Sequence, residues 1–486
     1  MVFRPLLLAT LAIAVSACSG RYFTAADAPP AVDRYALAEL PQPEHWTGIV
    51  FNGARIGFAH TRVSARSDGD FEIRSEASLL LRFLGFEKQI RLRTTDVVGP
   101  DLALKRFEAS HHIDGSDLEV KGEFVAGVLV VHITNANASM VRSYPVADAV
   151  LPASALLLYP ATRGLEVGRH YRFHVFTTET QRISEVEQRI AGYEKSPLFD
   201  GEAYKIITRL QGQETTSWVD RQARPLFELA LNGVMIAALE DEAAAKRHLA
   251  AASLNKQDIM LDFSLVRPNR AIASPRRVAR LEILLAGVDS DPVSGPGQEC
   301  EADSNGWRCL LQAGHPESAA DDTRPYMVSS LTVPYGHPQI QATARQIGDA
   351  SMPVRDRIRH ILDWLDVNIR KHPTDSFSAL DVLRTRRAEC QGHAYLYAAL
   401  ARALDIPTRI VNGLVYSGEH EGFLYHSWAE SLIDGNWLAV DPTFGQAVAD
   451  ATHIKLLEGE ELADLVALTG WVGRVSVSVL GYEYGL

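Results

Sequence analysis

The chain has 486 residues, enough for about two or three ordinary domains, with 47% hydrophobic and 22% charged residues. Its formal net charge is -12 and it contains no long basic run, which argues against a nucleic-acid partner. The composition is that of a globular protein and excludes a low-complexity or fibrous chain.

The first residues are typical of an export signal. Arg4 supplies a positive charge, and the apolar run Pro5 to Val15 is too short to span a bilayer as a helix. Small residues then precede Cys18, and this pattern resembles the lipobox of bacterial lipoproteins. The resemblance implies a signal peptide over 1–17, a lipid on Cys18 and attachment to the periplasmic side of the cell envelope. By the same resemblance, Ser19 after the cysteine implies delivery to the outer membrane. The alternative is an ordinary signal peptide with an incidental cysteine.

The next part of the chain is expected to be a tether followed by a β-rich domain. Residues 18–44 are rich in Ala and Pro and lack periodicity. Over 45–290, Asn-Gly and Asp-Gly pairs recur between alternating stretches such as Val125 to Thr134. This pattern predicts a mostly antiparallel curved sheet or half-barrel. Its concave face could hold a lipid or a peptide, or its interior could be filled. Ala149 to Leu158 is expected to be helical.

The four cysteines define separate expectations. Residues 291–325 contain much Pro, Gly, Ser and Asp and are expected to be a linker. Within it, Cys300 and Cys309 flank an Asn-Gly turn and could form a disulfide in an oxidising periplasm, or remain free. If Cys18 is lipidated and that pair is bridged, Cys390 is left as a free thiol, which is unusual in an exported protein.

From residue 326 to 486 the pattern becomes mixed helix and strand, and it contains a candidate nucleophile. Cys390 begins a strongly periodic helix, where backbone N–H groups and the helix dipole favour a thiolate. Arg384, Arg386 and Arg387 lie just upstream and would add positive potential. The alternative is a buried structural cysteine. The N–H of Cys390 would be one oxyanion donor, and no second donor can be identified.

A β-hairpin downstream supplies the other two candidate residues. His426 begins one strand and Asp441 ends the next, with Asp434-Gly435 as the turn. This register sets Asp441 opposite Trp428 and diagonal to His426 on the same face of the hairpin. The carboxylate could then orient the imidazole. The alternative is a surface histidine and an aspartate that only starts a turn.

These segments together resemble the transglutaminase-like superfamily, a relative of the papain-like folds. That family has a helix-start Cys whose helix ends in "GIPAR", a "HAW" strand and a "DPT" strand. The corresponding segments here are "ECQGHAYLYAALARALDIPTR", "YHSWAES" and "NWLAVDPTF". Asp405 replaces the Gly of "GIP" and Ser427 the Ala of "HAW", and neither change removes a catalytic group. The resemblance covers about residues 326 to 460.

The resemblance implies a cysteine acyltransferase or peptidase with Cys390, His426 and Asp441 as its triad and no cofactor. Its substrates would be proteins or peptides, including cell-wall peptides, and its thioester would be resolved by water or by an amine. The expected fold class is α+β: a mostly antiparallel β domain over 45–290, then a transglutaminase-like α+β domain over 326–486.

Two other functions remain open. A metal site could be built from Cys390, His393, His420 and His426, because a Cys-x-x-His spacing suits zinc. The hairpin with Asp441 would then be unexplained. The chain could also be a non-catalytic scaffold or ligand-binding lipoprotein whose C-terminal domain binds peptides.

Overall fold

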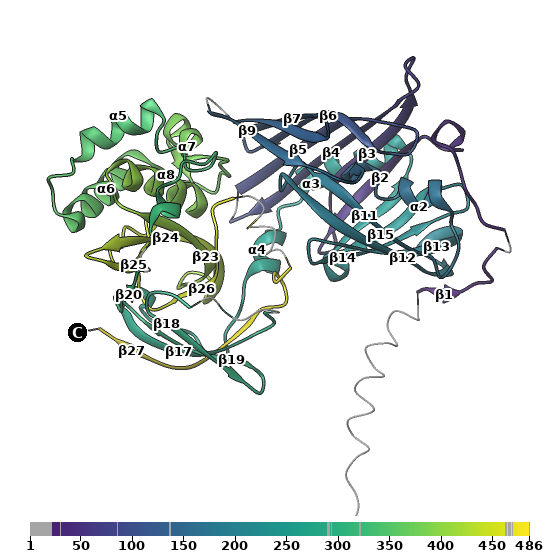
Figure 1. Ribbon diagram of the computed structural model, residues 1–486. Coiled ribbons are helices and arrows are strands. Elements are labelled where there is room, and N and C mark those ends of the chain that lie inside the picture. Colours follow the sequence, from purple (N-terminus) through teal and green to yellow (C-terminus); the bar gives the residue numbers. More distant parts are fainter. Residues whose placement is uncertain are drawn as a thin grey trace, which may run out of the picture.

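The computed structural model describes residues 22–29, 31–84, 86–135, 138–288, 292, 294–319, 322–461, 464, 468 and 470–485. The expected signal peptide and the lipidation site Cys18 therefore lie outside the described residues. Figure 1 shows two lobes, a strand-rich one from the N-terminal half of the chain and a mixed one that ends at the C-terminus. The fold class is α+β, as expected. Within the described ranges, no helix combines the length and apolar character needed to cross a membrane.

The strand-rich lobe is one long, mostly antiparallel sheet. Its strand order is β10-β11-β12-β13-β14-β15-β16-β2-β3-β4-β5-β6-β7-β8-β9, and among the described residues only β10 and β11 pair in parallel. Its strands are β1 Thr24–Ala25, β2 Glu44–Phe51, β3 Ala54–Ala65, β4 Phe71–Phe83, β5 Phe86–Val98, β6 Leu104–Ile113, β7 Ser116–Val125, β8 Val128–Asn135, β9 Ala138–Pro145, β10 Val150–Pro152, β11 His170–Thr177, β12 Arg182–Ser196, β13 Phe199–Leu210, β14 Gln213–Val219, β15 Pro225–Ala230 and β16 Met235–Glu240. Its helices are α2 Leu158–Arg163, α3 Glu242–Leu254 and α4 Ile259–Ser264.

The sheet curves into the half-barrel that the alternating sequence predicts. In β7, buried and exposed side chains alternate almost without exception, so one face lies in the core and the other in water. Leu118 on β7 and Val186 on β12 belong to one buried cluster although their strands are far apart in the strand order. The hydroxyl of Tyr144 on β9 donates to the carbonyl of Gln181 at 2.6 Å, which brings one edge of the sheet to the turn between β11 and β12.

The concave face is largely filled by the segment after β9. Ala155 is fully buried in the same core cluster, and the Ser154 hydroxyl donates to Asp96 of β5 at 2.6 Å. A cavity of about 190 Å³ remains beside these residues, smaller than most small-molecule sites. The expected helix over Ala149 to Leu158 is wrong at its start, because residues 150–152 form β10 and α2 begins only at Leu158.

The expected tether also differs from the structure. β1 pairs with β12, and Leu37 and Leu40 are buried in the core of the half-barrel. Parts of the range 22–44 are therefore packed against the domain. Short Ala-Pro segments lack periodicity in the sequence, so their packing against distant strands leaves no local signal.

The described part of the second lobe contains two larger sheets and one two-stranded sheet. The first has the order β18-β19-β17-β27, with strands β17 Val278–Ala286, β18 Gln298–Asp303, β19 Gly306–Gln312 and β27 Ser476–Tyr484. Cys300 and Cys309 oppose each other on β18 and β19 and form the expected disulfide. The range 291–325 is thus not only a linker: it contributes a hairpin to a sheet whose other strands come from both sides of it in the chain.

The second sheet and four helices form the core around the candidate nucleophile. The sheet order is β20-β25-β24-β23-β26, with β20 Glu317–Ser318, β23 Thr408–Ser417, β24 Gly422–Ile433, β25 Asn436–Val440 and β26 His453–Glu458. The helices are α5 Pro338–Ile347, α6 Val354–Asn368, α7 Ala379–Thr385 and α8 Cys390–Ala403, and β21 Arg370–Lys371 pairs in parallel with β22 Arg387–Ala388. α8 is buried along most of its length and packs on β24, α5, α6 and α7.

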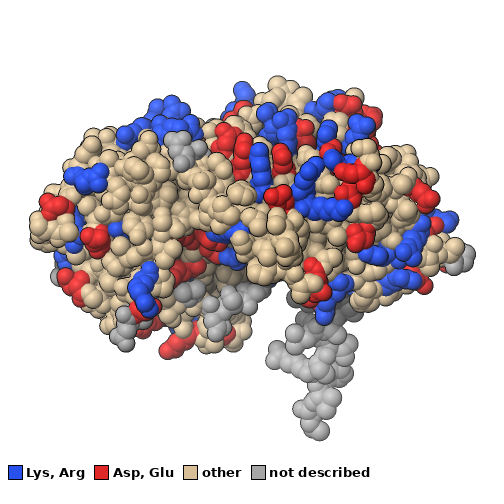
Figure 2. Space-filling model, turned by 45° about the horizontal axis from the view of Figure 1, so that its top comes forward, with Lys and Arg blue, Asp and Glu red and all other residues tan. Residues whose placement is uncertain are grey.

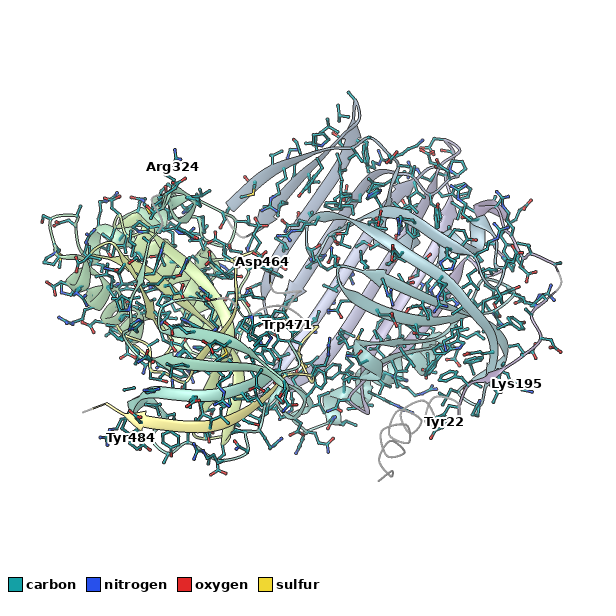
Figure 3. The ribbon with its side chains drawn as sticks, turned by 60° about the horizontal axis from the view of Figure 1, so that its bottom comes forward. Tyr22, Lys195, Arg324, Asp464, Trp471 and Tyr484 are labelled. Carbon is teal, nitrogen blue, oxygen red and sulfur yellow. A yellow bond between two sulfur atoms is a disulfide. The ribbon has the colours of Figure 1, made fainter. Side chains whose placement is uncertain are left out.

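Specific ion pairs join the lobes. Lys88 of β5, whose side chain is 6% exposed, lies 3.0 Å from Asp114 and 2.9 Å from Asp375 of the second lobe. Arg182 of β12 lies 3.0 Å from Asp464, which Figure 3 labels between the two lobes. In Figure 2 basic and acidic groups alternate over the strand-rich lobe, and the second lobe has wider uncharged areas.

Candidate active site

The start of α8 positions Cys390. Glu389 has an extended backbone, and its carboxylate accepts the N–H groups of Gln391 and Gly392, both at 2.8 Å. The N–H of Cys390 comes first in the helix and is not among those that Glu389 accepts. Cys390 is a partly buried residue, and it lines a cleft of about 850 Å³ that His426 also lines.

The thiol is less acidic than the sequence predicts. The Cys390 sulfur donates to a Glu389 oxygen at 3.0 Å. Burial, then the charge of Glu389 and this hydrogen bond, raise the pKa of Cys390 well above its usual value, and the Ser427 N–H opposes them only in part. Burial, together with the charge of Asp375, also raises the pKa of Glu389. The helix start is therefore occupied by its own capping carboxylate, and it does not favour a thiolate in this state.

The hairpin has the predicted register. Ile433 opposes Asn436 and Ala429 opposes Val440, and the turn residues Asp434 and Gly435 have φ of 53° and 79°. His426 and Asp441 consequently share a face, and His426 Nε2 lies 2.9 Å from Asp441 Oδ2. This contact uses Nε2 of His426, which leaves Nδ1 available to a second partner. Phe444 stacks on it with ring centroids 5.2 Å apart.

Asp441 is fully buried, and each of its carboxylate oxygens accepts two hydrogen bonds. Its Oδ1 accepts the N–H groups of Thr443 at 2.7 Å and Phe444 at 3.1 Å. Its Oδ2 accepts from His426 and, at 2.9 Å, from His453. Burial alone would raise the pKa of Asp441, but the charge and hydrogen bond of His426 and the hydrogen bond of His453 lower it far below its usual value. Asp441 is thus a carboxylate at any physiological pH.

His453 is the residue that the sequence analysis missed. Its Nδ1 lies 3.0 Å from the backbone oxygen of Asp450 and 3.6 Å from Asp450 Oδ1. Burial would lower the pKa of His453, but its hydrogen bonds to Asp441 and Asp450 raise it to about 9. Arg276 also binds the Asp450 carboxylate, at 2.7 Å. A charged His453 therefore lies between two carboxylates behind the candidate triad.

The place of His453 depends on one close backbone approach. Gly413 of β23 pairs with His426 on one side and with Lys455 of β26 on the other, at a register shift. A Cβ at Gly413 would lie 1.9 Å from the Ile454 carbonyl oxygen. A glycine here lets β26 approach β23 and carry His453 to Asp441.

The cleft brings together two of the three expected residues, Cys390 and His426, and the buried Asp441 is joined to His426 by its hydrogen bond, although the thiol proton is directed at Glu389. Cys390 and His426 line the same cleft, and the N–H of Ser427, next to His426, acts on the sulfur. A triad also requires the Cys390 sulfur to approach a ring nitrogen of His426, and this contact is a prediction.

The metal alternative is not favoured by this geometry. His393 Nδ1 hydrogen-bonds to the Glu389 carbonyl at 2.8 Å, and His420 Nδ1 to the Ser417 hydroxyl at 2.9 Å. The described residues with ligand atoms within 4.8 Å of one another are His426, Asp441 and His453, a different set. His426 and His453 both direct Nε2 at Asp441 Oδ2, so a metal bound there would have to displace two hydrogen bonds.

Comparison with known proteins identifies the domain. Residues 341–442 match the family model of the transglutaminase-like superfamily, so the chain carries a transglutaminase-like domain. It is 26% identical over 117 residues to kyphoscoliosis peptidase of Mus musculus, and equally to that of Homo sapiens. Each alignment covers 21% of this chain and 17% of the relative, so only a small part of the relative's length is spanned.

Two solved structures show weaker similarity. One is a candidate cysteine protease from Cytophaga hutchinsonii, with a TM-score of 0.27, 18% identity and coverage of 46% of this chain and 83% of that chain. The other is a β-barrel-like protein of unknown function from Brucella abortus, with a TM-score of 0.32, 9% identity and coverage of 41% and 95%.

Proposed function

We propose that the chain is a thiol-dependent acyl-transfer enzyme of the cell envelope that attacks carboxamide or peptide bonds. The observation that carries this proposal is the His426–Asp441 hydrogen bond of 2.9 Å in a cleft that also exposes Cys390. The match of residues 341–442 to the transglutaminase-like superfamily supports thiol chemistry. Cys390 is the nucleophile, His426 the general base and acid, and Asp441 the group that orients the imidazole.

The reaction begins with proton transfer. The Cys390 thiol leaves Glu389 and gives its proton to His426, and the sulfur attacks the carbonyl carbon of the substrate. The N–H of Cys390 binds the resulting oxyanion. When the C–N bond breaks, His426 returns the proton to the leaving amine and a thioester remains on Cys390.

The second half resolves the thioester. Water or an amine gives a proton to His426 and attacks the thioester carbonyl, and the C–S bond breaks. The thiolate then takes the proton back from His426. Water gives a peptidase or amidase, and an amine gives a transglutaminase.

Alkylation tests the proposal without knowledge of the substrate. Iodoacetamide should label Cys390, and His426→Ala should slow the labelling near neutral pH because the base is lost. The control is His248→Gln, which removes another buried histidine, one that lies in the strand-rich lobe beside Glu240. Equal rates in the wild type and His426→Ala would overturn the role of His426.

A scaffold is the second candidate, and the raised pKa of Cys390 favours it. A scaffold needs no thiolate, so its Cys390 would react no faster than a free thiol of the same exposure. Turnover of a casein or cell-wall peptide substrate that is lost in Cys390→Ala would exclude this candidate.

The location is part of the same proposal. Cleavage before Cys18 and lipidation there would anchor the chain at the periplasmic side, in the outer membrane, with proteins or peptides as substrates. Cys18→Ala should release the protein from membranes, and recovery of the variant only in membranes would count against the anchor.

A further inference from the structure

Five exposed basic residues lie together beside the cleft, on β21, β22 and the end of α7. They are called the basic rim: Arg370, Lys371, Arg384, Arg386 and Arg387. The strands β21 and β22 bring two of them side by side, because Arg370 pairs with Arg387. The N–H of Arg370 also donates to the carbonyl of Arg386 at 2.9 Å. Residues distant in the sequence therefore gather on one surface.

The charge of the basic rim is almost uncompensated. Among the described residues, one acid comes within 4.0 Å of a charged atom of the rim: Asp381, 3.5 Å from Arg384. The Asp381 side chain is 1% exposed, so it contributes little negative charge at the surface. Arg386 instead lies over the Trp364 ring at 5.3 Å. The chain has a net charge of -12, so its average surface carries more acidic than basic groups. A group of cations without acidic partners differs from that average.

The basic rim is continuous with the candidate active site. Lys371 lines the cleft together with Cys390 and with His372 and Ala388. Burial first, then the charges of Arg387 and Arg370, lower the pKa of the cleft-lining His372. Burial lowers the pKa of His393 as well, and Lys371 adds to it. The positive potential thus reaches into the cleft.

The positive potential of the basic rim does not lower the pKa of the Cys390 thiol. The pKa of Cys390 is raised, and the causes that act on it are burial, Glu389, Ser427 and Asp441 rather than the arginines. Lys371 lines the cleft, and the arginines are exposed beside it in the chain or across the β21–β22 pair, so a molecule that enters the cleft from this side meets the cations. Three acids also line the cleft, Asp258, Glu389 and Glu419, so positive charge is concentrated on the side of Lys371 and the cleft is not positive throughout.

We propose that the basic rim binds an acidic segment of the peptide substrate and so directs peptides with Asp or Glu beside the reacting bond into the cleft. The proposal rests on the proposed function and names its substrate class. Exposed cations at the edge of a binding site mainly affect association rates and salt dependence, since each contact is weak.

Binding can be measured apart from catalysis. In the Cys390→Ala protein, a fluorescent peptide of alternating Glu and Gly should bind more tightly than the matched Gln-Gly peptide, by fluorescence polarisation. Added salt should weaken the binding. The Arg370→Gln, Arg387→Gln double variant should bind the acidic peptide several-fold more weakly. The control is Arg106→Gln with Arg345→Gln, which removes two exposed arginines without an acidic partner among the described residues.

Equal binding of the two peptides, or equal losses in the rim and control variants, would overturn the proposal. Binding to vesicles with anionic lipid but not to the acidic peptide would overturn it too and would assign the rim to a membrane surface. A second measurement uses the thiol: iodoacetate, which is anionic, should lose reactivity relative to neutral iodoacetamide in the rim variant. If the proposed function is wrong, the wild-type protein with Cys390 will not turn over peptide substrates. The binding results do not depend on turnover, so the two failures can be told apart.

Discussion

His453 Nε2 lies 2.9 Å from Asp441 Oδ2, the same oxygen that His426 contacts. Asp441 is thus held by a second imidazole in addition to two backbone N–H groups. Since His453 is charged between two carboxylates, it fixes the position of Asp441 and draws part of its charge away from His426. His453 is therefore a positioning residue, and it does not line the cleft among the residues described there.

Replacing His453 should weaken catalysis less than replacing His426. In His453→Gln, the amide can donate one hydrogen bond to Asp441 but carries no charge, so Asp441 would attract the His426 proton more strongly. The pH at which the alkylation rate of Cys390 reaches half its maximum should shift, which loss of packing alone would not cause. His248→Gln serves as the control for removing a buried histidine. An unchanged pH profile in His453→Gln would contradict the positioning role.

The stability of the protein should fall as pH rises from about neutral to above 9. The pKa of His453 is raised from 6.5 to about 9 in the folded state. A raised pKa stabilises the fold fully below the unfolded value, and the contribution disappears as pH increases through the folded value. The full effect is on the order of 3 kcal/mol. Urea unfolding at pH 6 and pH 9.5 should show a decrease in the wild type and a smaller one in His453→Gln.

Local and distant contacts differ in what the sequence can predict. The contact of His426 with Asp441 depends on one tight turn, so counting residues from Asp434-Gly435 predicts it. His453 reaches Asp441 because β26 pairs with β23, which is not its neighbour in the chain, and because Gly413 allows a close approach. Neither feature has a local pattern.

The pKa of the Cys390 thiol also depends on contacts that the sequence does not show. A helix start next to arginines predicts a lowered pKa for Cys390, but the result depends on burial and on where the Glu389 carboxylate points. The arginines turn out to face solvent. Likewise, β17, β18–β19 and β27 form one sheet from three separate stretches, so the boundaries drawn at 290 and 325 from composition divide it.

The disulfide should stabilise the second lobe without taking part in catalysis. Cys300 and Cys309 are 9 residues apart, so the entropic gain is no more than about 3 kcal/mol. The Cys300→Ser, Cys309→Ser double variant should unfold at lower urea concentration and keep its reaction rate. Free thiols at both positions in protein made in the periplasm would contradict the disulfide. Loss of activity at unchanged stability would contradict its dispensability.

Glu389 should restrain the thiol in the resting enzyme. Its carboxylate accepts from the Cys390 sulfur at 3.0 Å, and its charge opposes formation of a neighbouring thiolate. Glu389→Gln removes this charge while an amide oxygen can still accept a helix N–H. The alkylation of Cys390 by iodoacetamide should therefore reach half its maximal rate at a lower pH than in the wild type.

The matched control is Glu419→Gln, which removes an acid of the same cleft that is not among the groups acting on the sulfur. Circular dichroism and urea unfolding would show whether α8 keeps its start without the full carboxylate cap. The opposite result, slower alkylation in Glu389→Gln with an intact fold, would mean that Glu389 accepts the thiol proton as a base. His426 would then no longer be the group that activates Cys390, and the order of proton transfers proposed above would have to begin at Glu389.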